Sequence, residues 1–153
     1  MTDAPEGFTL VRNLDATPEQ TWNAWTSADE AAEWWHPHGA ITPRETVDID
    51  ARVGGRYRYT MVDQVSGSEY ETGGEYTIVE PHSKLAFSWG YIDAAVANSP
   101  LVTLTIDDLG GLTRLTFDIR GVEGIKGDDS FYDGWESALD SLAAYLGQSA
   151  VHG

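Results

Sequence analysis

Residues 56–61 read Arg-Tyr-Arg-Tyr-Thr-Met, and apolar and polar side chains alternate along them. A period of two is typical of a β-strand with one buried face and one face in water. Several later segments show the same alternation. Their expected buried faces are Tyr70, Thr72, Gly74, Tyr76 and Ile78; then Leu85, Phe87, Trp89 and Tyr91; then Val102, Leu104 and Ile106; then Leu115, Phe117 and Ile119. Turn residues such as Ser66-Gly67-Ser68 separate the segments, which predicts an antiparallel sheet.

A long amphipathic helix is expected after the last strand. Its apolar face consists of Phe131, Trp135, Leu139, Leu142 and Leu146, which follow each other at helical spacing. Such spacing places the side chains on one side of a helix of about five turns. We expect Asp128 or Asp129 to cap its start and Gly147 to end it.

Two short helices are expected near the N-terminus, after a strand from Phe8 to Leu14. Thr17-Pro18-Glu19-Gln20 combines an N-cap, a proline at the first helical position and a capping-box glutamine. A helix is therefore predicted from about Pro18 to Thr26. Ser27-Ala28-Asp29-Glu30 repeats the capping pattern, and the second helix should end at Trp34-Trp35, because a proline follows and disfavours helical backbone.

This order of elements predicts a single α+β domain in which a curved antiparallel sheet wraps around the last helix. The 153 residues fit one domain, and we expect its ordered core to span residues 8–147. Gly54-Gly55 and Gly73-Gly74 are expected to let the strands bend as such a sheet requires. A hydrophobic content of 41% is that of a globular protein rather than of a disordered one.

The composition bears on partners and location. With 25 acidic and 9 basic side chains the formal net charge is −16, which repels nucleic acid and anionic membrane surfaces. We interpret the acidity as a source of solubility. The absence of cysteine excludes disulfides, thiolate catalysis and cysteine-ligated zinc. The N-terminal Met-Thr-Asp-Ala-Pro-Glu-Gly lacks the regions of a signal peptide, so we expect a cytoplasmic protein.

Motifs along nearly the whole chain resemble the START-like (SRPBCC) superfamily. The chain is similar to the branch of that superfamily named after the C-terminal domain of the activator of a heat-shock-protein ATPase. The matching segments are Ala16-Thr17-Pro18 with residues 22–26 and 34–35; Asp50-Ala51-Arg52-Val53-Gly54-Gly55-Arg56-Tyr57; Gly74-Glu75-Tyr76, Glu80-Pro81 and residues 84–89; residues 111–115; and Gly134-Trp135-Glu136 with Leu139 and Leu142. The resemblance implies the helix-grip fold. It implies less about function, because the branch is chemically diverse.

The family label does not by itself predict a chaperone-stimulating role. The eukaryotic activator carries a further N-terminal domain that binds the chaperone. We expect this chain to lack that domain, because its residues are all used by the START-like fold.

The aromatic residues indicate a ligand site. The chain has 6 tryptophans and 7 tyrosines, and the pleat should turn several of these rings towards the last helix. Buried tyrosine hydroxyls need polar partners, which suits a cavity with a few polar contacts. The residues predicted to bind a small hydrophobic ligand are Trp35, His36, Tyr57, Tyr59, Met61, Tyr76, Trp89, Phe117, Phe131, Trp135 and Leu139. The alternative is that the rings simply fill the core.

Other candidate sites carry less weight. His36-Pro37-His38 could hold a metal, but a catalytic metal needs about three protein ligands and the sequence offers no convincing third. The outer face of the first hairpin carries Arg56, Arg58, Glu69, Glu71 and Glu75. Cross-strand ion pairing explains these charges without a bound anion. No phosphate loop, nucleophile elbow or dinucleotide motif is present, so we predict neither a metal nor a cofactor.

Three functions stay open, and we assign no catalytic residue. We favour a non-enzymatic binder or carrier of a small hydrophobic molecule, monomeric or homodimeric, with no nucleic-acid or membrane partner. The second is an enzyme of the polyketide cyclase or aromatase kind, which needs an inward-facing acid or base. Asp118, Arg114 and Arg120 are expected to face outward, against that hypothesis. The third is a chaperone-related or stress-response interaction module, which predicts an exposed apolar patch.

Overall fold

The chain folds as a sheet bent around helices. The computed structural model describes residues 7–36, 39–90, 100–121 and 131–152, except for the side chains of Phe131 and residues 148–152. Within these ranges eight strands form an antiparallel sheet in the order β1-β8-β7-β6-β5-β4-β2, with β3 also paired to β4. The strands are β1 (Gly7–Leu14), β2 (Ala40–Ile41), β3 (Asp48–Ile49), β4 (Arg56–Asp63), β5 (Glu69–Glu80), β6 (Lys84–Ser88), β7 (Leu101–Asp108) and β8 (Thr113–Arg120). The helices are α1 (Pro18–Thr26), α2 (Ala28–Trp34), the short 3-10 helix η1 (Arg44–Thr46) and α3 (Phe131–His152).

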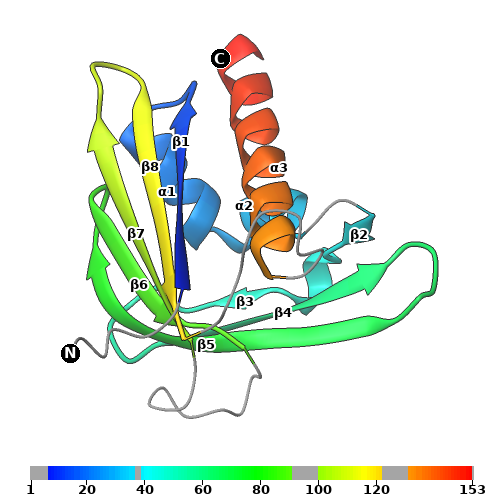
Figure 1. The fold of residues 1–153 in the computed structure, drawn as a ribbon. Coiled ribbons are helices and arrows are strands. Elements are labelled where there is room, and N and C mark those ends of the chain that lie inside the picture. Colours follow the sequence, from blue (N-terminus) through cyan, green and yellow to red (C-terminus); the bar gives the residue numbers. More distant parts are fainter. Residues whose placement is uncertain (1–6, 37–38, 91–99, 122–130, 153) are drawn as a thin grey trace.

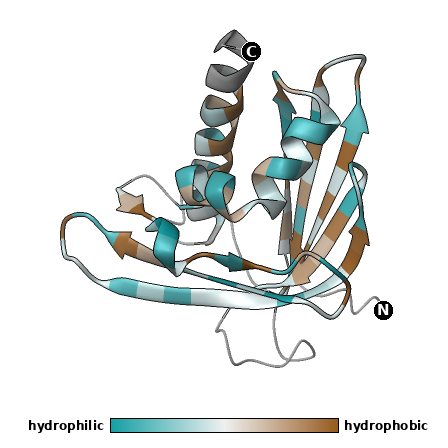
Figure 2. Ribbon diagram, turned by 180° about the vertical axis from the view of Figure 1, so that it is seen from behind, coloured by the Kyte–Doolittle hydropathy of each residue, from teal (hydrophilic) through white to brown (hydrophobic). Residues whose placement is uncertain are grey.

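The sheet curves so that its inner face surrounds α3. β4 and β5 run beneath this helix, whereas β6, β7, β8 and β1 stand beside it, and α1 and α2 occupy the same inner side (Figure 1). Apolar residues alternate with polar ones along the strands next to α1 (Figure 2). Val102, Leu104, Leu115 and Phe117 are all buried, as the alternation predicts. The predicted α+β helix-grip fold is confirmed.

Gly74 allows β5 to pass close to the end of β6. A Cβ atom at this position would lie 1.9 Å from the carbonyl oxygen of Ser88. Two hydrogen bonds, one from each neighbour of Gly74, hold the strands together here. Gly73 N–H donates to the Gly90 carbonyl (3.0 Å), and Glu75 N–H donates to Ser88 Oγ (2.9 Å). There is therefore no room for a side chain at Gly74, and a glycine is required where β5 approaches the end of β6.

The predicted inner face of β5 is wrong near both of its ends. The pairing with β6 shifts register between Tyr76 and Ile78, and such a bulge exchanges the two faces beyond it. Val79, opposite Leu85, therefore packs against the core in the place predicted for Ile78. At the other end Tyr70 is 55% exposed, because the β4–β5 hairpin extends beyond the helices. The prediction for Tyr91 lies outside the described residues.

Helices α1 and α2 have the predicted bounds, but only α1 has the predicted cap. Thr17 Oγ1 accepts a hydrogen bond from Gln20 N–H (3.2 Å), and Gln20 Oε1 accepts one from Thr17 N–H (2.9 Å). Ser27 precedes α2 and makes no side-chain capping bond, so the second predicted capping box is wrong.

This difference between the two caps leads to a stability prediction. Thr17→Ala should lower the free energy of unfolding by about 1 kcal/mol, because the N-cap hydrogen bond to Gln20 N–H is lost. Ser27→Ala should change it by less than about 0.5 kcal/mol, because no side-chain bond is removed. Urea denaturation of both variants tests the pair. Equal losses would contradict the assignment of the caps.

Helix α3 closes the inner face of the sheet. Trp135, Leu139, Leu142 and Leu146 are buried along it, as their spacing predicts. The helix continues to His152, so the prediction that Gly147 ends it is wrong. The expected caps Asp128 and Asp129 lie outside the described residues.

Arg12 fastens α3 to the edge strand β1. Its guanidinium lies 3.5 Å from Glu136 Oε2 and 3.3 Å from Asp140 Oδ1, and these two carboxylates are one helical turn apart. The Arg12 side chain is 23% exposed and that of Glu136 30%, whereas the Asp140 side chain is 54% exposed, so the contact with Glu136 is the better shielded of the two. The contact sets the position of the helix along the strand.

Candidate ligand-binding site

One group of rings, which we call the inner aromatic cluster, lies where α1 and α2 meet the sheet. Its members are Trp25, Trp34, Trp35, Tyr57, Tyr59, Tyr76 and Phe87. Trp35, which directly follows α2, is at its centre and stacks on Tyr59 (ring centroids 4.4 Å apart) and on Tyr57 (5.4 Å). All seven rings are buried. Ring contacts of this kind add to the stability gained from burial alone.

A second group, the outer aromatic cluster, lies under the first turns of α3. Its members are Phe8, Trp89, Phe117, Tyr132 and Trp135. The Trp135 ring is 4.5 Å from Phe117 and 5.2 Å from Trp89. Trp89 and Tyr132 are only partly buried, so this cluster is nearer to solvent than the inner one. The two clusters join where Trp89 Nε1 donates to the Tyr59 hydroxyl at 3.2 Å.

The polar atoms of these rings fall into two classes. Trp34 Nε1 donates to the Ala24 carbonyl (2.9 Å), and the Tyr57 hydroxyl donates to the Ser88 carbonyl (2.7 Å), so both are tied to the scaffold. Four other polar atoms of these rings are buried and have no hydrogen-bond partner among the described residues: Nε1 of Trp25, Trp35 and Trp135, and the hydroxyl of Tyr76. A buried polar group without a partner costs about 1–3 kcal/mol, and such groups usually meet a water or a ligand.

Burial keeps the inner tyrosines neutral. It raises the pKa of Tyr57, Tyr59 and Tyr76 well above the ordinary value of 10.0, and the charge of Asp50 adds to the effect at Tyr76. Tyr145 on α3 is more exposed, and burial together with its hydrogen bond to Glu30 raises its pKa to about 12. The inner hydroxyls are therefore neutral hydrogen-bonding groups at physiological pH.

The raised pKa values predict a loss of stability at alkaline pH. In the unfolded chain these phenols ionise at the ordinary value of 10.0, whereas in the folded chain they stay protonated. The stability they provide is complete below pH 10.0 and falls as the pH rises above that value. Absorbance titration of tyrosinate should show Tyr57, Tyr59 and Tyr76 ionising together with unfolding. Their early, non-cooperative ionisation would contradict this prediction. Comparison with Tyr57→Phe shows how much of the loss of stability at alkaline pH comes from Tyr57.

Most of the predicted ligand residues lie together in the two clusters. Trp35, Tyr57, Tyr59 and Tyr76 belong to the inner cluster, and Trp89, Phe117 and Trp135 belong to the outer one. Leu139, on α3, is fully buried, and Met61 is partly buried and packs against the core. The Phe131 side chain lies outside the described residues. The described rings contact one another, so they fill much of the interior as well as line it.

His36 lies beside the inner cluster, at the end of α2. Its Nδ1 is 3.1 Å from Thr42 Oγ1, and the Thr42 hydroxyl donates to the Trp35 carbonyl at 2.8 Å. Because the Thr42 proton is used in that bond, Thr42 accepts the proton of His36 Nδ1. Among the described residues no group of three or more metal-ligating side chains exists, and His38 lies outside them.

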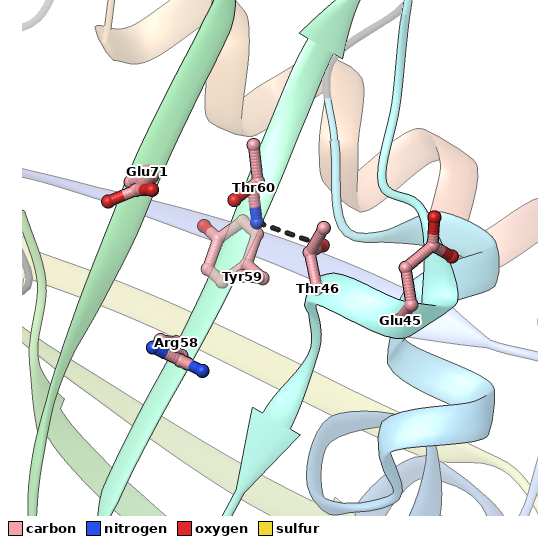
Figure 3. A pocket seen from close by; sticks show the side chains of 6 residues that line it. All are labelled: Glu45, Thr46, Arg58, Tyr59, Thr60 and Glu71. Atoms are coloured by element: carbon pink, nitrogen blue, oxygen red, sulfur yellow. Dashed lines mark hydrogen bonds between the residues drawn. The ribbon is translucent and has the colours of Figure 1, made fainter.

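A pocket that the sequence did not predict lies on the outer side of β4 (Figure 3). It has a volume of about 250 Å³ and is lined by Glu45, Thr46, Arg58, Tyr59, Thr60 and Glu71. It forms because η1 leaves the edge of the sheet, where Thr46 Oγ1 accepts the Thr60 backbone N–H at 3.2 Å (Figure 3). No alternation or motif in the sequence signals this departure. Its mixed charges do not suit a hydrophobic ligand.

The predicted ion pairing on this outer face is only partly correct. Arg56 lies 3.5 Å from Glu75, as expected. Arg58 pairs instead with Asp48 at 3.0 Å, because β3 brings Asp48 directly opposite it. Glu69 and Glu71 form no ion pair with any described residue.

The carboxylate expected to point outward does so. Asp118 on β8 accepts hydrogen bonds from Arg120 (2.7 Å) and from the Thr9 hydroxyl (2.7 Å), both at the surface. These bonds hold the pKa of Asp118 below its ordinary value in spite of partial burial.

No described helix is both long enough and apolar enough to cross a membrane.

The chain matches the sequence model of the activator of Hsp90 ATPase homologue 1-like proteins over residues 15–147. A solved structure from Chromobacterium violaceum is similar with 26% identity and a TM-score of 0.79, covering 93% of this chain and 98% of that one. A protein of the same family name from Silicibacter pomeroyi has 28% identity and a TM-score of 0.76, covering 94% and 99%. A solved structure from Nitrosomonas europaea has 19% identity and a TM-score of 0.79, covering 98% of this chain and 99% of that one. At this identity it supports the fold alone. No functionally curated protein matches the chain in sequence.

Proposed function

Because the chain belongs to the family of activator of Hsp90 ATPase homologue 1-like proteins, a branch of the START-like superfamily, we propose that it binds a small hydrophobic molecule between its sheet and α3. The observation that carries the proposal is the set of buried, unpartnered polar atoms on aromatic rings. Sites for small molecules are mostly apolar and have a few well-placed polar groups. The inner face combines both features, since two aromatic clusters surround these atoms.

A binding role accounts for the site better than an enzyme does. Asp118, the carboxylate considered for acid–base chemistry, lies on the outer surface and pairs with Arg120. The polar side chains buried among the described residues are Thr21, Thr42, Thr72, Ser88 and Thr113. None of these is an acid or base with a pKa suited to proton transfer. We therefore propose a cytoplasmic binder or carrier without a metal or cofactor.

A thermal-shift screen tests this function. The compounds are fatty acids, flavonoids and polyketide-like molecules, added to the full chain. A ligand present at about one hundred times its Kd stabilises the native state by about 2.7 kcal/mol, which raises the Tm by about 5 °C or more for a chain of this size. Tyr70→Ala is the matched control, because Tyr70 is an exposed ring on the same sheet and should leave the shift unchanged. Failure of every class to raise the Tm would contradict the proposal.

A further inference from the structure

The indole N–H of Trp135 is a buried donor that meets no acceptor in the part of the chain that the structure describes. The Trp135 side chain is 4% exposed, and no described residue forms a hydrogen bond with its Nε1. Its nearest aromatic neighbour with a polar group, Trp89, already donates its own N–H to Tyr59. An indole N–H can only donate, so whatever meets it must be an acceptor.

The position of Trp135 distinguishes it from the other unpartnered rings. Trp35 is enclosed by stacking between Trp34 (5.8 Å) and Tyr59 (4.4 Å), and Trp25 meets Trp34 edge to face at 4.5 Å. Trp135 instead belongs to the outer cluster, whose members Trp89 and Tyr132 are partly exposed. Trp135 therefore lies beside Trp89, a side chain that solvent reaches.

The surroundings are suited to a neutral acceptor. No lysine, arginine or histidine is buried among the described residues, so an ionised group inside would have no counter-ion. Burial also holds the pKa of the Tyr59 phenol above its ordinary value, so the hydroxyl beside Trp89 is a neutral group. An ionised carboxylate that leaves water without a cationic partner loses much more solvation energy than it regains from neutral donors. The formal net charge of −16 further opposes an anion.

We propose that Trp135 Nε1 recognises a neutral hydrogen-bond acceptor on the ligand, the oxygen of a ketone or an ether, and that the site rejects ionised carboxylates. This inference rests on the proposed function and specifies the chemical class of the ligand. The apolar body of the ligand packs on Phe117 and Trp89. The oxygen is placed by Trp135.

Three naphthalene probes of similar size test the inference: methyl naphthyl ketone, ethylnaphthalene and naphthoate. Affinities are measured by titration at neutral pH, where naphthoate is ionised. The ketone should bind about tenfold more tightly than ethylnaphthalene, which corresponds to one hydrogen bond, and at least about tenfold more tightly than naphthoate. Naphthoate binding as tight as that of the ketone would overturn the inference while leaving the proposed function in place.

Proton–nitrogen correlation spectra identify the donor. Each of the 6 tryptophans gives one indole signal, and substitution by phenylalanine assigns each signal. The ketone should move the Trp135 indole proton downfield, and ethylnaphthalene should not. The Trp34 signal is an internal control, because its N–H is held by the Ala24 carbonyl. An unmoved Trp135 signal in the ketone complex would overturn the assignment.

Substitution separates recognition from packing. Trp135→Phe should weaken ketone binding about tenfold relative to ethylnaphthalene, because only the ketone loses a hydrogen bond. Trp34→Phe removes an indole N–H that is already engaged, so it should leave this ratio unchanged. The ratio is measured within each variant, so a general loss of stability does not affect it. An equal loss for ketone and hydrocarbon in Trp135→Phe would overturn the inference. Binding of none of the probes would also overturn it, and the broader screen then decides separately on the proposed function.

Discussion

Replacing Trp35 with alanine should lower the free energy of unfolding by about 4 kcal/mol, a large part of the stability of a typical domain. The ring stacks on Tyr57 and Tyr59 and is 2% exposed, so its loss leaves a cavity between α2 and the sheet. Trp35→Phe should cost much less, because stacking is retained and the unpartnered N–H is removed.

Urea denaturation measures both effects. The matched control is Tyr70→Ala, which removes an aromatic ring of the same sheet that is 55% exposed and should cost less than about 1 kcal/mol. A loss for Trp35→Ala no greater than that for Tyr70→Ala would show that the inner cluster is not the centre of the core.

Gly74→Ala should destabilise the protein by about 3 kcal/mol or more, although it adds only one methyl group. The new Cβ would lie 1.9 Å from the Ser88 carbonyl oxygen and 2.6 Å from its carbon, and both are backbone atoms that cannot move alone. Relief requires β5 and β6 to separate, which breaks the hydrogen bonds from Gly73 and Glu75.

The control for this variant is another glycine. A Cβ at Gly134, within α3, would meet no atom within 4 Å, so Gly134→Ala should stabilise the helix by about 0.5–1 kcal/mol. Thermal and urea denaturation of the two variants should therefore show changes of opposite sign. Changes of the same sign would contradict the close approach of the strands at Gly74.

Local signals predicted much of the fold. The bounds of α1 agree with the prediction to the residue, because Thr17, Pro18 and Gln20 act within one turn of the backbone. Alternation also identified β7 and β8, where buried residues alternate along the strand, and the first half of β4, where Tyr57 and Tyr59 are buried. The family resemblance is confirmed by the match over residues 15–147.

Features that depend on pairing between distant segments were not predictable. β2 and β3 have two residues each, too few for a period, and the bulge after Tyr76 depends on how β6 pairs. Arg58 pairs with Asp48 on β3 rather than with a glutamate of β5, because β3 lies next to β4. For the site, the sequence indicated which rings face inward. It could not indicate that Trp34 Nε1 finds a carbonyl whereas Trp135 Nε1 finds none.

The pairing of β1 with β8 sets the order of events during synthesis on the ribosome. Thr9 and Asp118 meet across these strands although they are 109 residues apart in the chain. β1 leaves the exit tunnel first but has no neighbouring strand until β8 emerges. The partners of Arg12 lie on α3, which is synthesised later than β8. An unpaired, half-apolar strand is a site of wrong association in a nascent chain. The sheet edge at β1 and its contact with α3 can therefore form only after β8 and α3 have been synthesised.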